Sequence, residues 1–203
     1  MEAQENYSLE RRRYIGGSDV AAILGLNPWK TNIELWEEKT GLRQPENISQ
    51  KEEVKRGVNM EPLLRNIFAI TRPHLTVQEG RFLVHPDYLF MAANIDGIVD
   101  DGISPGVLEI KTARVKNLSD WKDRVPDYYY LQCLHYLAVT GWRYAILYAY
   151  LEIVLPDREI TGYLREYRIE RKEEEIDLLL KAEIEFWDYV QKKIRPNLVC
   201  RIN

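Results

Sequence analysis

The 203-residue chain contains little cysteine and no long hydrophobic run. Its two cysteines, Cys133 and Cys200, lie far apart and lack the spacing of a metal-binding motif, which argues against a zinc or iron–sulfur site. No apolar stretch approaches the roughly 20 residues that a membrane-spanning helix needs. The first residues have neither the charge nor the apolar segment of a signal peptide. We therefore expect a cytoplasmic protein with reduced thiols and no membrane partner.

The chain also lacks the excess of positive charge that is typical of nucleic-acid-binding proteins. Its net charge is −4, which argues mildly against such a partner. The charge is unevenly spread, however. A basic run covers residues 11–13, a second basic stretch covers 113–125, and acidic residues concentrate in 173–185. Net charge therefore does not exclude DNA as a partner.

Linkers, low-complexity tracts and internal repeats are absent as well, so we expect one domain over residues 1–203. Apolar periodicity and capping signals predict an α/β domain around a mixed sheet. The predicted helices cover 18–24, 31–41, 51–71 (with a kink or new start at Pro62), 127–140 and 172–193; the predicted strands cover 78–85, 88–99, 106–112, 142–154 and 160–169. The prediction has three parts: a helical N-terminal region over 8–45, a core over 51–170 and a C-terminal helix over 172–193.

Charged residues on apolar strands provide the first functional signal. Asp96 lies on a strand that is apolar on both faces, where a buried carboxylate is costly unless it is paired or binds a metal. The alternative is an Asp that caps the turn at Gly97. On the next strand Glu109 and Lys111 share one face, as they also would on an ordinary amphipathic strand. If the polar faces of this hairpin coincide, two carboxylates and an ammonium converge, which suits Mg²⁺ binding and phosphodiester hydrolysis.

Other side chains are candidates for the same cleft, each with a simpler alternative. Glu61 is a further carboxylate, or an N-cap beside Pro62. Gln132 and Tyr136 share one face of the helix after the strand pair, or form a pair at the edge of the core. Arg114 and Trp121 belong to the basic stretch, which suits DNA contact through phosphates and a stacked base. An ordinary surface loop anchored by one tryptophan explains that stretch equally well.

Several ordered motifs resemble a known family. Asp96, Glu109-Ile110-Lys111 and Gln132 resemble the PD-(D/E)XK nuclease pattern, and the match is closer to its YqaJ-like and bacteriophage lambda exonuclease-like branch. Four further blocks are also similar to that branch: residues 13–25, 56–57, 61–62 and 125–132. The pattern departs from the family at two positions, where Ile95 replaces a proline and Leu134 a second glutamine.

The resemblance implies a restriction-endonuclease-like core, with a mixed central sheet flanked by helices, and metal-dependent DNA hydrolysis. It implies Asp96, Glu109, Glu61 and the backbone carbonyl of Ile110 as metal ligands, and Lys111 as the catalytic lysine, with Gln132 in support. It also implies a 5′-phosphate site made of Ser18 and an arginine, for which Arg11 has the best spacing and Arg12 and Arg13 are rivals. Without the resemblance, Ser18 is a plain helix N-cap beside solvated arginines.

The predicted function is therefore that of a Mg²⁺-dependent exonuclease, with Mn²⁺ as an alternative cofactor because oxygen ligands suit both ions. By resemblance it acts 5′→3′ on double-stranded ends and leaves 3′ single strands for recombination, in a prokaryotic cell or a phage host. A single-strand annealing protein and a ring-shaped homotrimer are the partners that the resemblance suggests. The alternatives are an endonuclease or a single-strand nuclease with the same site, and a non-catalytic DNA-binding protein on the same fold.

Overall fold

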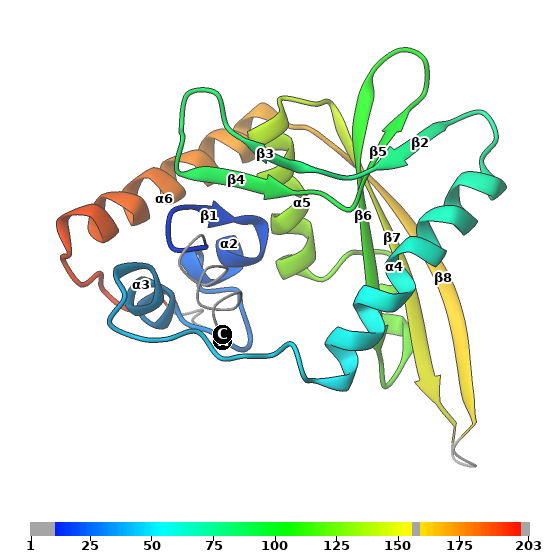
Figure 1. Cartoon of the computed structure of the whole chain (residues 1–203), viewed down its shortest axis with the longest axis horizontal. Helices are drawn as coiled ribbons and strands as arrows, with labels where there is room; N and C mark the ends of the chain where they lie inside the picture. Colours follow the sequence, from blue (N-terminus) through cyan, green and yellow to red (C-terminus); the bar gives the residue numbers. More distant parts are fainter. Residues whose placement is uncertain (1–10, 156–158, 200–203) are drawn as a thin grey trace.

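The computed structural model describes residues 11–155 and 159–199, so Cys200 and the predicted start of the N-terminal region at residues 8–10 lie outside the described residues. Figure 1 shows the order of the elements. They are β1 (Ile15–Gly16), α2 (Gly17–Ile23), α3 (Asn32–Thr40), α4 (Glu52–Thr71), β2 (Thr76–Glu79), β3 (Phe82–Val84), β4 (Met91–Asn94), β5 (Gly97–Asp100), β6 (Pro105–Arg114), a 3-10 turn (Leu118–Trp121), α5 (Asp127–Thr140), β7 (Tyr144–Val154), β8 (Ile160–Glu170) and α6 (Glu173–Lys192).

The strands form two sheets. The larger one has five strands in the order β2-β5-β6-β7-β8, and the smaller one has three in the order β1-β4-β3. In the larger sheet β6 and β7 run parallel, and the other neighbours are antiparallel. Parallel neighbours require a crossover connection, which is provided here by α5. The predicted mixed sheet is therefore confirmed.

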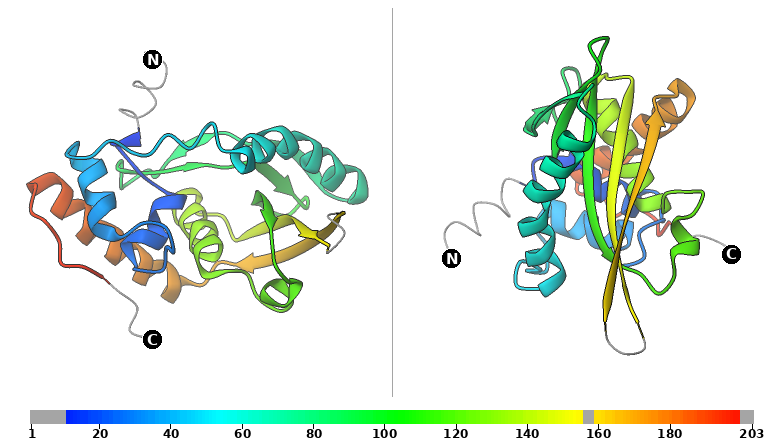
Figure 2. Two further views of the ribbon diagram at one scale, coloured as in Figure 1. Left: turned by 90° about the horizontal axis from the view of Figure 1, so that it is seen from below. Right: turned by 90° about the vertical axis from the view of Figure 1, so that its right-hand side faces the viewer.

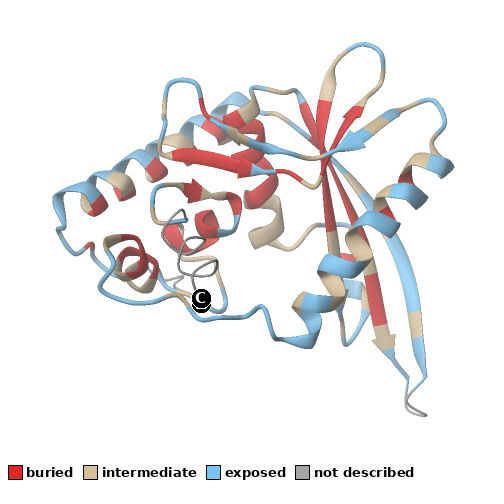
Figure 3. Cartoon of the chain, viewed as in Figure 1, coloured by how far each residue is buried: buried red, intermediate tan, exposed pale blue. Residues whose placement is uncertain are grey.

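Helices cover both faces of the larger sheet (Figure 2). The alternation along β7 explains this arrangement: Tyr144, Ile146 and Tyr148 pack in one cluster with Leu64 and Phe68 of α4. The intervening β7 residues pack in a second cluster together with α2, α5 and α6. Burial follows the same pattern, since the central strands and α5 are the most enclosed elements (Figure 3). None of the helices in the described part of the chain is long and apolar enough to cross a membrane.

The predicted strand over 88–99 was wrong in one respect that matters for the site. The structure divides it into β4 and β5, which belong to different sheets, with Ile95 and Asp96 between them. Here the chain leaves the smaller sheet and enters the larger one. Asp96 is therefore a residue at a strand start and does not belong to the face of a continuous strand.

One helix prediction also needs correction. Pro62 does not start a new helix, because α4 continues over 20 residues with Pro62 inside it. In α6, Glu183 is fully buried, whereas the neighbouring Ile184 is 38% exposed.

Candidate active site

The beginning of β5 and the middle of β6 bring the predicted acidic residues together. The two strands pair antiparallel with Gly97 opposite Leu108, so Asp96 extends the register toward Glu109. The Ile110 N–H donates to Asp96 Oδ2 at 2.7 Å, which fixes the aspartate against β6. Lys111 Nζ forms an ion pair with Glu109 Oε1. The expected convergence of two carboxylates and one ammonium on the hairpin is present.

Glu109 is the most constrained member of this group. Its residue is 1% exposed, and its Oε2 atom is buried without a hydrogen-bond partner. Burial, and the nearby Asp96 carboxylate, raise the pKa of Glu109 to about 8, against the opposing effect of Lys111. The pKa of Lys111 is raised too, because the attraction of Glu109 and Asp96 outweighs the burial of the ammonium. The surroundings of Glu109 therefore favour an additional positive charge beside it.

Helix α5 supplies the next layer of contacts. Gln132 Nε2 donates to Glu109 Oε1 at 2.7 Å and to the Tyr136 hydroxyl at 2.8 Å. The Tyr136 hydroxyl in turn donates to the Asn94 carbonyl at 3.0 Å. These buried groups lie one helical turn apart and connect β6 to the end of β4. Gln132, which is itself held by Tyr136, thus contacts the same Glu109 oxygen as Lys111 and fixes its position.

Glu61 on α4 lies close to Asp96. Arg65 Nη1 donates to Glu61 Oε1 at 3.1 Å and to the Asp96 carbonyl at 2.6 Å, so one arginine ties both acidic residues together. Partial burial and the charge of Asp96 raise the pKa of Glu61. The sequence did not point to Arg65; the structure identifies it as the link between α4 and the strand break.

The N-terminal residues form a second polar group next to α5. Helix α2 begins at Gly17, so Ser18 lies in its first turn, and the N-cap prediction was wrong. The Gly16 N–H is instead capped by Asp19 Oδ2 at 3.0 Å, which leaves the exposed Ser18 hydroxyl to accept from Arg11 Nη2 at 3.0 Å. The lack of a side chain at Gly17 lets α2 pack closely on α5. A Cβ there would lie 2.7 Å from the Tyr136 ring and 2.8 Å from Gln132 Cγ.

Asp19 holds the N-terminal residues in place through ion pairs. Its buried carboxylate contacts Lys39 Nζ at 2.7 Å and lies 3.7 Å from Arg11. Burial alone would raise the pKa of Asp19, but Lys39 and Arg11 outweigh it and lower the pKa to about 2. Arg12 turns away toward Gln44, to whose Oε1 it donates at 3.0 Å, and Arg13 is exposed. The predicted pairing of Arg11 with Ser18 is thus present in the structure.

The residues at β5 and β6 fit a hard divalent cation. Two carboxylates lie side by side, one with an orphaned oxygen, and their charges repel in a buried setting unless a cation or a proton lies between them. Within the described residues no group of three acidic, histidine or cysteine side chains is gathered closely enough to hold a metal ion. The side chains that could hold such an ion are Asp96 and Glu109, with Glu61 near Asp96.

Comparison with known proteins now places the chain. The model of the family described as the YqaJ-like viral recombinase domain matches residues 6–143, more than half of the chain. The chain belongs to this family. The protein YqaJ of Bacillus subtilis (strain 168) is 37% identical over 187 residues, which cover 92% of this chain and 56% of YqaJ. The chain thus spans little more than half the length of this relative. The predicted family membership is confirmed.

Solved structures support the fold of this YqaJ-like domain. An alkaline exonuclease from Laribacter hongkongensis superimposes with a TM-score of 0.69, at 22% identity and 94% coverage of both chains. A phage-related exonuclease from Haemophilus somnus 129PT gives a TM-score of 0.56, at 14% identity, covering 89% of this chain and 95% of its own. At these identities the likeness shows a common fold, which confirms the predicted fold class.

The basic stretch of the YqaJ-like domain contains the remaining predicted contacts. Trp121 is 3% exposed and packs beside Tyr129 and Tyr167, so its ring has no free face for a base. The predicted stacking of a base on Trp121 is therefore wrong. Trp121 instead anchors the surface loop, as the alternative interpretation proposed. Arg114 is half exposed and donates to the buried Glu152 at 3.2 Å.

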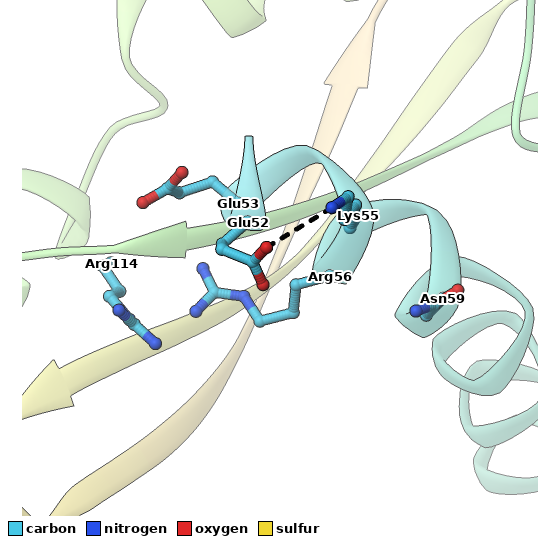
Figure 4. Close-up of a pocket in the computed structure, with 6 residues that line it drawn as sticks. All are labelled: Glu52, Glu53, Lys55, Arg56, Asn59 and Arg114. Atoms are coloured by element: carbon cyan, nitrogen blue, oxygen red, sulfur yellow. Dashed lines mark hydrogen bonds and ion pairs between the residues drawn. The ribbon is translucent and has the colours of Figure 1, made fainter. Parts of the chain in front are cut away.

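Arg114 also borders a shallow pocket against the first turns of α4 (Figure 4). Arg56 lines the same pocket and contacts Glu152 at 2.5 Å. Sequence reasoning placed Arg56 only within a family motif, and the structure shows why it lies there: Glu152 holds both arginines. The pocket opens at the end of β6, three residues beyond Lys111.

Proposed function

We propose that this chain is a metal-dependent DNA exonuclease. The observation that carries the proposal is the buried Glu109 oxygen without a partner, beside a second carboxylate and a lysine. Asp96 and Glu109 would hold Mg²⁺, or alternatively Mn²⁺, with Glu61 and the Ile110 carbonyl as further ligands. When bound, the metal supplies a water of lowered pKa and polarises a phosphoryl oxygen. Family membership and the shared exonuclease fold support this reading.

The protein side chains have separate roles around the scissile phosphate. Lys111 keeps its proton at neutral pH, since its pKa is raised, and therefore stabilises negative charge that grows on the phosphate. Gln132 holds the Glu109 carboxylate in one orientation through its Nε2 donor. Arg65 does the same for Glu61 and the backbone of Asp96. The site is thus organised before substrate arrives, which favours catalysis over binding alone.

The exonuclease acts 5′→3′ on double-stranded ends and leaves 3′ single strands. The Ser18 hydroxyl and the Arg11 guanidinium lie 3.0 Å apart on an exposed surface and offer donors suited to a terminal phosphate. Gly17 packs directly on Gln132 and Tyr136, so this phosphate site is next to the residues that position Glu109. An end anchored there places a neighbouring phosphodiester at the active site.

The deciding experiment compares linear double-stranded DNA with 5′-phosphate and 5′-hydroxyl ends in the presence of Mg²⁺. We expect strand loss from the phosphorylated 5′ end. Lys111→Ala should lower the rate about 100- to 1000-fold, because it removes a charge that stabilises the transition state. Ser18→Ala should lower it about 10- to 100-fold on phosphorylated ends alone, the range for a lost hydrogen bond to a charged group.

Other outcomes of this experiment favour other functions. Cleavage of circular as well as linear DNA would identify an endonuclease with the same site, and cleavage of single strands alone a single-strand nuclease. Tight DNA binding that Mg²⁺ does not change, without cleavage by the folded protein, would identify a non-catalytic binding module. Equal rates on both kinds of end would exclude the role of Ser18.

The proposal extends to partners and setting. The 3′ single strands would be handed to a single-strand annealing protein in the cytoplasm of a prokaryotic or phage-infected cell. A ring-shaped trimer would keep the enzyme on its substrate. Size-exclusion chromatography with light scattering tests that assembly, and a monomer at working concentration would contradict it.

A further inference from the structure

The loop between α2 and α3 presents one large aromatic ring to solvent. Trp29 is 73% exposed, the most of any aromatic residue in the described ranges 11–155 and 159–199. The loop itself is well fixed: Asn27 Oδ1 accepts from the Trp29 N–H at 2.8 Å and from the Lys30 N–H at 3.0 Å. Thr31 then caps α3. The backbone thus holds the tryptophan in place while its ring stays largely unburied.

This ring is the outer end of a row of aromatic contacts that reaches the proposed catalytic lysine. Trp29 meets Tyr128 edge to face, with ring centroids 5.1 Å apart. Tyr128 meets Tyr129 at 4.4 Å, and Lys111 Nζ lies 5.3 Å from the Tyr129 centroid. The row therefore leads from solvent to Lys111, along the first turn of α5.

We propose that Trp29 binds a nucleobase of the DNA strand whose phosphate lies in the active site, by stacking its exposed ring on the base. The proposal rests on the proposed function. An aromatic ring offers a sequence-independent platform for bases, which suits an enzyme that must accept every end. The edge-to-face contact with Tyr128 orients the ring, and the high exposure leaves it open to a ligand. Trp121, the tryptophan expected to stack, is buried and does not compete for this role.

The test measures binding of a fluorescein-labelled duplex end by anisotropy, in a Lys111→Ala background so that cleavage does not interfere. Trp29→Ala should weaken binding about 5- to 150-fold, the range for one base–aromatic stack. Trp29→Phe should restore most of the loss, because phenylalanine keeps a ring. Tyr163→Ala is the matched control: Tyr163 is 37% exposed on β8, two strands away from β6, and its loss should change nothing.

A second arm identifies the base. Duplexes with an abasic nucleotide at successive positions are measured with and without the Trp29→Ala change. At one position the abasic DNA should bind the parent weakly and gain no further penalty from the substitution. An equal effect of Trp29→Ala at every position, or unchanged affinity for intact DNA, would overturn the proposal. Failure of the nuclease proposal is recognised separately, since it would leave the unmutated chain without metal-dependent cleavage.

Discussion

The free oxygen of Glu109 predicts how the protein responds to pH and to metal. The pKa of Glu109 is about 8 in the folded protein, above its ordinary value of 4.5. Between pH 4.5 and pH 8 the folded protein therefore keeps a proton that the unfolded chain releases. Without metal, the free energy of unfolding should therefore fall as pH rises through this window. A divalent cation competes with that proton, so Mg²⁺ should stabilise the protein more at pH 9 than at pH 6.

Thermal unfolding with and without Mg²⁺ checks this. At 100 times the dissociation constant a bound ion adds about 2.7 kcal/mol, which raises the Tm by several degrees. Glu109→Gln is the matched variant, because glutamine preserves size and polarity but neither titrates nor carries charge. It should lose most of the Mg²⁺ shift and flatten the pH dependence. The same Mg²⁺ shift in both proteins would show that the metal binds elsewhere.

For single residues, the sequence predicted the acidic hairpin and several of its neighbours, but it missed two basic residues that hold carboxylates in place. Asp96, Glu109 and Lys111 could be found because a charge on an apolar strand is unusual. Arg65 and Lys39 could not, because a basic residue on a helix is ordinary until its partner across the fold is known. The error at Trp121 has the same origin: an aromatic in a basic stretch does not reveal whether Tyr129 and Tyr167 enclose it.

At the scale of elements, the contact of α2 with α5 links the proposed phosphate site to the proposed active site. Gly17→Ala would place a Cβ 2.7 Å from the Tyr136 ring, so the helices must separate or Tyr136 must shift. We expect a loss of about 1–3 kcal/mol in stability, the usual cost of overpacking. Exonuclease activity should fall as well, since Tyr136 bonds to Gln132 and Gln132 to Glu109.

The neighbouring glycine is a built-in control for this prediction. A Cβ at Gly16 would meet its nearest atoms at 3.9 Å, which is ordinary van der Waals contact, so Gly16→Ala should leave stability and activity nearly unchanged. Urea unfolding and the rate on 5′-phosphorylated DNA measure both variants. If the two substitutions behave alike, close packing at residue 17 is not what joins the sites.

Helices and strands could be predicted where the local sequence pattern determines them. The predictions failed where tertiary contacts override that pattern. Apolar periodicity and a terminal glycine placed α5 at 127–140, as observed. At Pro62 no new helix starts, because packing of Leu64 and Phe68 on the larger sheet holds α4 continuous. The division at Ile95–Asp96 could not be anticipated either, since an apolar run does not show that its two halves pair with different sheets.

For the whole molecule, a buried His–Glu pair connects the elements on one side of the larger sheet. His135 Nδ1 lies 2.9 Å from Glu183 Oε1, and its Nε2 lies 3.0 Å from the Ala92 carbonyl. Both residues are fully buried, and together they join α5, α6 and β4. Burial would lower the pKa of His135, but Glu183 and the Ala92 carbonyl outweigh it and raise the pKa. Its stabilising contribution is therefore complete below the ordinary pKa of 6.5 and is lost as pH rises through the raised value.

This pair should have a specific energetic signature. His135→Leu leaves the Glu183 carboxylate buried without its partner and should cost about 3–5 kcal/mol in urea unfolding near neutral pH. Combining it with Glu183→Leu removes both charges, and the double variant should recover most of that loss, because apolar side chains of similar volume replace a buried ion pair well. A double variant as unstable as the single one would mean that the shape of the pair, rather than its charge, holds α5 and α6 together. In that case the free energy of unfolding of the unmodified protein should also stay constant over the pH range in which His135 loses its proton.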